Sequence, residues 1–464
     1  MSETKTSKLT NWIKTSTSLR MFVVGFLILI LLVPLSYIKD LIRERKNLQN
    51  QVVTEINENW GNEIVLYGPI LKTPYFTYTE STITDSKTKK IQTIREKNIN
   101  YAYFFPNELD VSGSIETELK KRGIYSASVY NSNIKIKGDF SLPDFSLINE
   151  DVKEKDIVWE KTQILLKTSN LKGLNDEMII KIGNKSLSFQ SNFQNQQQHS
   201  ATSYDKYGNL RNHDSYLIET PSFNLKESFV EDLVAYNLDY NASGSSRFNI
   251  IPIGKETKMQ LTSNWKDASF KGEFLPFNPD KIKEDGFDAH WKVLQMNRPY
   301  GQQFKSLPNL YKYSFGVDFF IPVDDYQQNE RSAKYGFLMI ALTFLLFFLI
   351  QTLSKINIHP FQYMMIGLAL VVFYTLLISI SEHSDFTKAY LIAGSAVVIL
   401  ITLYSKSILK IWKFPVLIGI SLTALYGFIF VIIQLENYAL LVGSIGLFAI
   451  LTGVMFASRK IDWG

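Results

Sequence analysis

Six long stretches with almost no charged residues constrain the fold of this chain more than any other feature. The first runs from Met21 to Ile38, and the other five follow one another after Arg331. Each has 18 to 21 residues, which at about 1.5 Å per helical residue crosses most of a hydrocarbon core roughly 30 Å thick. The sequence therefore predicts a membrane protein with one N-terminal and five C-terminal transmembrane helices.

The C-terminal spans are expected at residues 336–353, 363–380, 386–404, 414–434 and 438–458. The loops between them are short, which favours an antiparallel helix bundle. Lys388 lies near the start of the third of these spans, where its long side chain can reach the membrane interface. The first span, residues 21–38, is interpreted as an uncleaved anchor, because its apolar core is long and no small-residue cleavage site follows it.

The segment between the first and second spans, residues 39–334, has a different pattern. It opens with a charged, helical stretch that ends at Gly61 and is interpreted as a stalk. Short runs of alternating apolar and polar residues follow, for example residues 64–79, 98–105, 124–140, 178–190 and 257–265. This alternation predicts an α+β protein whose large middle domain is β-rich and sandwich-like, with two packed sheets.

Three parts of the middle domain have weaker signals. The polar, turn-rich stretch Gln190 to Ser215 is interpreted as a long loop or hairpin tip. Asn107 to Lys121 and Glu227 to Tyr236 have a weak helical spacing and are interpreted as helices that decorate the sheets.

The distribution of Lys and Arg predicts the orientation in the membrane. The N-terminal tail (residues 1–20), the loop at Lys355, the loop from Lys406 to Lys413 and the tail at residues 459–464 carry basic residues, whereas the alternate loops carry none. Basic loops stay in the cytoplasm, so both termini are expected inside and the β-rich domain outside, in the periplasm of a Gram-negative cell. Lys39, Arg43, Arg45 and Lys46 lie on the opposite side, but long translocated domains are largely exempt from this rule.

Several classes of function lose support from composition and missing motifs. The chain has no cysteine and only five histidines, so it has no disulfide, thiolate nucleophile or cysteine-bound metal. Its net charge of +5 is spread among nearly as many acidic residues, which argues against nucleic acid as a partner. Nucleotide-binding and common hydrolase motifs are absent. We expect no cofactor and no metal.

A series of short motifs runs from the end of the middle domain to the end of the chain. The first group is Asn264-Trp265, Ser269-Phe270, Gly272, Phe274-Leu275-Pro276, Gly286-Phe287 and Ala289-His290-Trp291. The second group is Pro322, Asp324, Tyr326, Gln327, Arg331, Lys334, Tyr335, Leu338 to Phe344, His359-Pro360, Gln362-Tyr363, Gly367, Phe373-Tyr374, Ser381-Glu382-His383 and the terminal Arg459, Lys460, Ile461, Asp462 and Trp463. Together these motifs resemble the CreD family of bacterial inner-membrane cell envelope integrity proteins. The resemblance implies a bacterial inner-membrane protein whose expression accompanies envelope stress and whose biochemical activity is not established.

One candidate site consists of acid and base residues at membrane level. Glu382, His383 and Asp385 follow the span at residues 363–380, where neighbouring helices can desolvate them and shift their pKa values. The functional interpretation is a proton or ligand site. The alternative is a solvated turn between helices. His359-Pro360, at the other membrane surface, is interpreted as structural because Pro suits the first turn of a helix.

A second candidate site is an aromatic cluster in the β-rich domain. Its members are Trp265, Phe270, Glu273, Phe274, His290 and Trp291. Such residues can line a groove for a lipid, glycan or peptide, or they can fill the domain core. An acid and base pair for hydrolysis, drawn from Glu273, Asp288 and His290, is a weaker alternative.

Two further features lie just before the second span and on the last span. Asp324, Tyr326, Arg331 and Lys334 mark the junction between the middle domain and the membrane. Ala449, Gly453 and Ala457 form a stripe of small residues on the last span, which lets another helix approach closely.

Topology and resemblance together favour a non-enzymatic protein whose outer domain binds or senses an envelope component. The expected partners are the lipid bilayer and an envelope lipid, a glycan or a membrane protein. Two alternatives stay open: a transporter of a lipid or lipophilic compound through the helix bundle, and a periplasmic envelope hydrolase.

Overall fold

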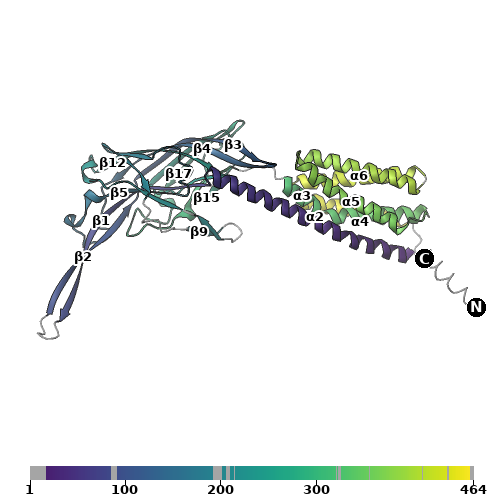
Figure 1. The fold of residues 1–464 in the computed structure, drawn as a ribbon, viewed down its shortest axis with the longest axis horizontal. Helices are drawn as coiled ribbons and strands as arrows, with labels where there is room; N and C mark the ends of the chain where they lie inside the picture. Colours follow the sequence, from purple (N-terminus) through teal and green to yellow (C-terminus); the bar gives the residue numbers. More distant parts are fainter. Residues whose placement is uncertain are drawn as a thin grey trace, which may run out of the picture. The chain divides into compact units, whose positions relative to one another are not determined.

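The computed structural model describes residues 17–84, 91–191, 201–204, 210–213, 215–319, 321, 325–354, 356–409, 411–435 and 438–459. The chain divides into two compact units. The helical unit comprises Met1–Gln51 and Val323–Gly464, and the β unit comprises Val52–Pro322. Helix and strand labels follow Figure 1.

The helical unit is built from long apolar helices and one short polar helix. They are α2 (Thr17–Trp60), α3 (Asp325–Lys334), α4 (Gly336–Ser354), α5 (Pro360–Ser381), α6 (Phe386–Leu409), α7 (Lys413–Gln434) and α8 (Ala439–Ser458). Among the described residues, six helices are long and apolar enough to cross a membrane. The prediction of a membrane protein with one N-terminal and five C-terminal spans is confirmed.

The ends of the five C-terminal helices differ from the predicted ends by at most five residues, as in α6, predicted at 386–404 and observed at Phe386–Leu409. The first span and the stalk form one continuous helix, α2, with Pro34 inside it. Membrane helices tolerate an internal proline.

The start of α5 shows why His359 and Pro360 follow each other. Pro360 occupies the first helical position, His359 Nδ1 accepts a hydrogen bond from the Phe361 amide at 3.2 Å, and Gln362 Oε1 accepts one from the His359 amide at 2.9 Å. These bonds satisfy backbone groups that a helix start leaves free, in agreement with the structural interpretation of this pair.

The β unit contains one nine-stranded sheet within the described residues. Its main path runs in the order β15-β19-β13-β1-β5-β11-β8, and β2 and β18 extend it beside β1. The strands are β1 (Ile64–Thr84), β2 (Ile91–Phe104), β5 (Gln163–Thr168), β8 (Gln190–Ser191), β11 (Tyr216–Glu219), β13 (Arg247–Ile250), β15 (Ala268–Gly272), β18 (Gln303–Phe304) and β19 (Phe315–Phe319). β1 and β2 pair antiparallel from Leu71–Phe104 to Thr84–Ile91 and project as a two-stranded ribbon (Figure 1).

The second large sheet of the described residues has eight strands in the order β16-β17-β14-β3-β4-β12-β6-β7. They are β3 (Glu108–Arg122), β4 (Tyr125–Ser141), β6 (Ile179–Ile182), β7 (Lys185–Ser188), β12 (Leu233–Ser245), β14 (Glu256–Ser263), β16 (Ile282–Lys283) and β17 (Gly286–Leu294). A separate hairpin joins β9 (Ala201–Tyr204) and β10 (Leu210–His213), within the stretch predicted as a loop or hairpin tip.

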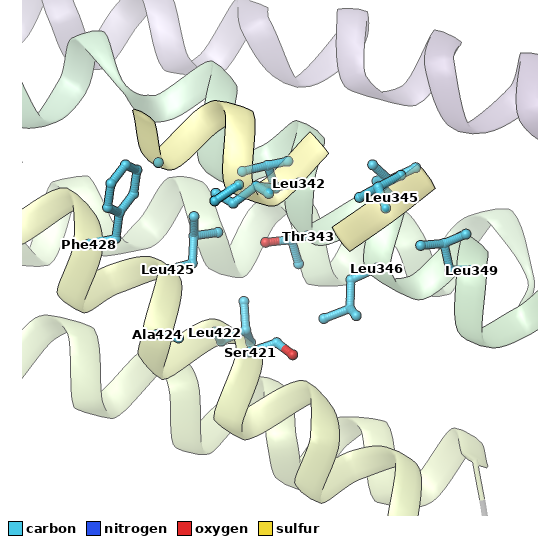
Figure 2. A pocket seen from close by; sticks show the side chains of 14 residues that line it. Leu342, Thr343, Leu345, Leu346, Leu349, Ser421, Leu422, Ala424, Leu425 and Phe428 are labelled. Carbon is cyan, nitrogen blue, oxygen red and sulfur yellow. The ribbon is translucent and has the colours of Figure 1, made fainter. Parts of the chain in front are cut away.

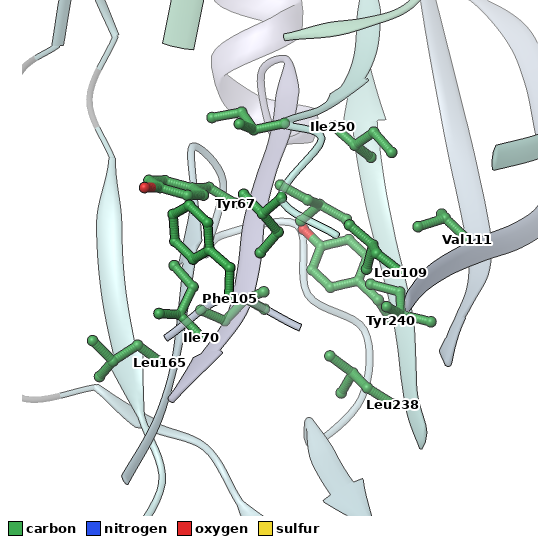
Figure 3. Close-up of a cluster of buried hydrophobic side chains, with 14 of the residues drawn as sticks. Tyr67, Ile70, Phe105, Leu109, Val111, Leu165, Leu238, Tyr240 and Ile250 are labelled. Atoms are coloured by element: carbon green, nitrogen blue, oxygen red, sulfur yellow. The ribbon is translucent and has the colours of Figure 1, made fainter. Parts of the chain in front are cut away.

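The two large sheets contribute side chains to one hydrophobic core. Figure 3 shows Tyr67, Ile70 and Leu165 of the first sheet in the same cluster as residues of the second. The second sheet supplies Leu109, Val111, Leu238 and Tyr240 to this cluster. The predicted β-rich domain is therefore present, with its alternating residues buried on the shared side.

Two predicted helices are wrong. Residues 108–121 lie in β3, which pairs with β4 on one side and β14 on the other. Burial alternates along its first residues because successive side chains point to opposite faces of the sheet. Residues 227–236 fall on a single 3-10 turn (Lys226–Ser228) and the start of β12. In both places the pairing of neighbouring strands outweighs a weak helical spacing.

Candidate functional site: a polar cluster at one end of the helix bundle

The short helix α3 packs across one end of the bundle, against α4, α5, α6 and α7. Its buried residues Tyr326, Asn329, Ser332 and Ala333 recur at helical spacing and so share one face. Only two of the four are apolar. The sequence of α3 therefore places polar side chains against the ends of the membrane helices.

Two hydrogen bonds attach α3 to its neighbours. Asp325 Oδ1 accepts from the amide of Phe386, the first residue of α6, at 3.2 Å. Arg331 Nη1 donates to the carbonyl of Ile433, in the last turn of α7, at 3.4 Å. Both partners are backbone groups that helix ends leave unpaired, so α3 closes the ends of these two helices.

We call five residues the polar cluster: Arg45 of α2, Asn329 and Ser332 on the buried face of α3, and Ser381 and Glu382 at the end of α5. Asn329 Nδ2 donates to Ser381 Oγ at 2.8 Å, and both residues are buried. Ser381 Oγ in turn donates to the carbonyl of Ile378 at 2.9 Å. Glu382 Oε1 lies 3.5 Å from Arg45 Nε, and its side chain is only 16% exposed.

Three oxygen atoms of the polar cluster are buried and receive no hydrogen bond from any described residue. They are Asn329 Oδ1, Ser332 Oγ and Glu382 Oε1. Leaving such atoms without a partner is costly, about 1–3 kcal/mol each. An arrangement of one carboxylate, one amide and one hydroxyl can accept or donate hydrogen bonds to a small polar ligand or share a proton.

The structure separates the three residues of the predicted membrane-level site. Glu382 belongs to the polar cluster, whereas His383 is exposed. Asp385 immediately precedes α6, and its Oδ1 accepts from the amide of Lys388 at 2.9 Å while its Oδ2 lies 2.8 Å from Lys388 Nζ. The hydrogen bond from Lys388 lowers the pKa of Asp385. Glu382 is thus the member of the trio with a buried carboxylate.

The predicted junction residues also divide. Tyr326 is buried and Arg331 bonds to α7. Lys334 forms an exposed ion pair with Glu330 at 3.2 Å, and such pairs contribute little to stability. Asp324 lies outside the described residues.

The aromatic side chains of the predicted groove lie in the core of the β unit or pack against it. Trp291 is 1% exposed and packs against Phe270 and Phe315, with ring centroids 5.7 and 6.0 Å apart. Phe274 also packs on Phe315, and Trp265 is half-buried against the same core. Trp291 is thus enclosed, whereas Trp265, Phe270, Phe274 and His290 are half-buried and Glu273 is exposed. A groove lined by these residues stays a prediction.

His290 and Glu273 are the polar members of that predicted site. His290 Nε2 lies 3.0 Å from Oδ1 of Asp288. The other carboxylate oxygen of Asp288, Oδ2, lies 3.1 Å from Lys283 Nζ. Partial burial opposes ionisation of Asp288, but the hydrogen bonds from Lys283 and Gln260, together with the nearby positive charge of Lys283, outweigh burial and lower the pKa of Asp288. Glu273 is exposed. No described hydroxyl is hydrogen-bonded to the His290 ring, so a nucleophile activated by this pair is not formed in the described part of the chain.

Within the described residues, no three His, Asp or Glu side chains lie close enough together to hold a metal ion.

The small-residue stripe of α8 has mixed surroundings. Ala449 lines a cavity within the bundle, and Gly453 has no atom near the position of a Cβ. The side chain of Ala457 lies outside the described part of the structure.

Sequence reasoning found Glu382 but missed its surroundings. Arg45 stood out only as a basic residue on the unexpected side of the membrane, and Asn329, Ser332 and Ser381 belong to no motif. The spacing of Asn329 and Ser332 on the face that also carries Tyr326 was the available signal.

The comparison with known proteins extends to almost the whole chain. Residues 16–464 match the family model described as "Inner membrane protein CreD". The chain is also 30% identical over 441 residues to the inner membrane protein CreD of Escherichia coli (strain K12), covering 94% of this chain and 91% of that protein. A match of this extent, together with the six apolar helices, shows that the chain belongs to the CreD family of inner membrane proteins.

Proposed function

We propose that this CreD-family protein is a non-enzymatic receptor that contributes to envelope integrity. In this proposal the β unit faces the periplasm and binds or senses an envelope component, and the bound state reaches the helical unit through α2 and the segment before α3. The orientation is supported by the basic residues of the loop from Lys406 to Lys413 and their absence from the loop after Ser381.

The observation that carries the proposal is the composition of the polar cluster. The polypeptide connects its two units twice, once through α2 and once before α3. Arg45 comes from α2, Asn329 and Ser332 come from α3, and Ser381 and Glu382 come from the end of α5. The polar cluster therefore brings together α2, α3 and the end of α5, and some of its buried polar atoms have no hydrogen-bond partner among the described residues.

A partly satisfied cluster suits a switch better than a rigid joint. Buried polar groups rigidify a structure when all of them are paired, and they leave room for a second arrangement when some are not. Movement of α2 relative to α3 changes which partner Glu382 and Asn329 have. Ligand binding to the β unit can thus shift the bundle between two states, provided that the ligand prefers one of them.

The test is a pair of variants at adjacent positions, read out by sensitivity of cells to cell-wall antibiotics. Glu382→Ala removes the buried carboxylate and should reproduce the phenotype of a deletion strain. His383→Ala changes an exposed side chain and should behave as the unchanged protein. Equal behaviour of the two variants, at equal protein levels in the membrane, would reject a role for the polar cluster.

A second experiment identifies the ligand of the β unit with the full-length protein. Full-length protein isolated in mild detergent should retain a lipid, glycan or protein from the envelope, identified by mass spectrometry. Recovery of chemically altered glycan or lipid products, dependent on His290, would instead support the hydrolase alternative.

Transport of a lipophilic compound is a second candidate function, favoured by the cavity inside the bundle. The cavity is lined by α4, α7 and α8, and transporters bind their substrates near the bilayer midplane. Uptake of a fluorescent lipid analogue across proteoliposome membranes, absent with protein-free vesicles, would support this function.

A further inference from the structure

A cavity of about 480 Å³ lies among three membrane helices of the helical unit. α4 contributes residues from Leu342 to Leu349, α7 from Ser421 to Phe428, and α8 from Gly446 to Val454. Figure 2 shows leucine side chains of α4 and α7 around this space, with Thr343 and Ser421 as the hydroxyl-bearing residues. The lining is therefore almost entirely hydrocarbon.

The position of the cavity along the helices places it in the middle of the span. Leu342 and Leu349 lie six and thirteen residues after Gly336, the first residue of α4. At 1.5 Å per residue this is about 9 to 20 Å from the helix start, in a hydrocarbon core roughly 30 Å thick. Molecules that reach this depth in quantity are the hydrocarbon chains of the bilayer itself.

The cavity has an open side toward the bilayer. α7 packs directly against both α4 and α8, whereas α4 and α8 face each other across the cavity. α8 is the span least covered by the rest of the protein, and the side chain of Ala424 in the cavity wall is exposed. A chain can thus enter between α4 and α8 without separating packed helices.

Filling this cavity with water and leaving it empty are both unfavourable. Two hydroxyl groups offer too few hydrogen bonds to hold water in a volume of this size. An empty cavity would lose the dispersion contacts of every lining side chain. One lining hydroxyl, on Thr343, is buried and has no partner among the described residues, but it can turn to the preceding helical carbonyl as Thr352 and Thr402 do.

We infer that the cavity is a binding site for one acyl chain of a bilayer phospholipid. The chain enters between α4 and α8 and fills the space against the leucines of α4, so that it joins α8 to the rest of the bundle. This site is separate from the polar cluster and does not depend on the proposed receptor function.

The test uses full-length protein in nanodiscs that contain a phospholipid with a photoreactive diazirine near the end of one acyl chain. After irradiation, mass spectrometry should locate adducts on cavity residues such as Leu345 and Ile450. A phospholipid with the diazirine beside its ester group should label other positions, because ester groups stay near the membrane surface.

Cavity-filling variants provide the matched comparison. Ala424→Phe and Ala449→Phe fill the site from two different walls and should abolish cavity adducts and the phospholipid that the protein retains during detergent purification. Thr423→Phe and Gly453→Phe add the same ring next to these positions but do not line the cavity, and should retain both. Thr343→Val should also retain both, since a hydrocarbon chain needs no hydrogen bond.

Two results would overturn the inference. One is labelling spread evenly over all lipid-facing helices and unchanged by either cavity-filling variant, with all variants melting at the same temperature. The other is a change from oligomer to monomer in Ala449→Phe with no loss of lipid, which would make a helix of a second copy the occupant.

Discussion

At the scale of single residues, the polar cluster depends most on Asn329. Its amide joins α3 to α5 through Ser381, and it is 1% exposed. Glu382 and Arg45 form the weaker contact, since Arg45 is 41% exposed and the pair is 3.5 Å apart. Charge pairs that water reaches are worth about 0–1 kcal/mol.

Asn329→Ala should therefore destabilise the helical unit by about 0.5–1.5 kcal/mol, because it removes a buried hydrogen bond and leaves the Ser381 hydroxyl only its bond to the Ile378 carbonyl. Thermal unfolding of the full-length protein in nanodiscs measures this loss. Glu330→Ala on the same helix removes only an exposed ion pair and should change stability by less than about 0.5 kcal/mol. Equal melting temperatures for the two variants would contradict the importance given to Asn329.

Asp318 makes the stability of the β unit depend on pH. Burial opposes its ionisation, but the hydrogen bonds and charges of Arg247 at 2.5 Å and Lys271 at 2.7 Å outweigh burial and lower its pKa. A carboxylate with a lowered folded-state pKa stabilises fully above its unfolded value, about 3.9, and this contribution is lost as pH falls through the folded value.

Asp318→Asn should cost about 1–3 kcal/mol at neutral pH, because Arg247 and Lys271 lose their shared partner. Below about pH 4 the melting temperature of the unchanged protein should fall more steeply than that of the variant. Part of the decrease in melting temperature with falling pH should persist in the variant, since hydrogen bonds from Lys292 and Lys226 also lower the pKa values of Glu256 and Glu154. Parallel curves over the whole range would exclude Asp318 as a source of the pH dependence.

At the scale of elements, α2 is the helix that belongs to both units. Its last turns are attached to the β unit by side chains of its C-terminal end. Trp60 Nε1 donates to the Tyr130 carbonyl at 3.3 Å, Lys120 Nζ lies 4.6 Å from the Trp60 ring, and Glu55 pairs with Arg122 at 2.6 Å. These contacts fix the end of α2 to strands β3 and β4.

Trp60→Ala should loosen this attachment. A loss of about 1–2 kcal/mol would raise amide hydrogen exchange in the last turns of α2 about 5- to 30-fold. Glu58→Ala, which changes an exposed side chain two residues earlier, should leave exchange unchanged. Unaltered exchange in Trp60→Ala would show that other contacts hold the helix end.

The elements that the sequence predicted well are those governed by one strong signal. An apolar run as long as Gly336–Ser354 allows few alternatives to a spanning helix, and the alternation of residues 124–140 predicted β4. The signal failed for residues 107–121, where buried Leu109, Val111 and Ile115 fit a strand as well as a weak helix. Only the neighbouring strands β4 and β14 decide between the two.

The candidate site was less predictable than the fold. Glu382 attracted attention as an acid at the end of a span, but Asn329 and Arg45 are distant in sequence and meet it only through the packing of α3 and α2. The aromatic residues show a different difficulty. Side chains such as Trp291 and Phe270 occur both in grooves and in cores, and only the register of β17 and β15 decides which way they point.

At the scale of the whole molecule, the function rests on the side of the membrane that each unit faces. A periplasmic receptor requires that the β unit lie outside the inner membrane and that the loop between α6 and α7 lie in the cytoplasm. The chain contains no cysteine, so single cysteines can be introduced into the otherwise unchanged protein without background labelling.

The most direct measurement is therefore labelling with a membrane-impermeant maleimide in cells whose outer membrane alone has been permeabilised. Ser114→Cys in β3 and Ser407→Cys near the end of α6 both replace exposed serines. Ser114→Cys should react at once, and Ser407→Cys only after the inner membrane is opened. The reverse pattern, with Ser407→Cys labelled first, would place the β unit in the cytoplasm and contradict the proposed receptor function.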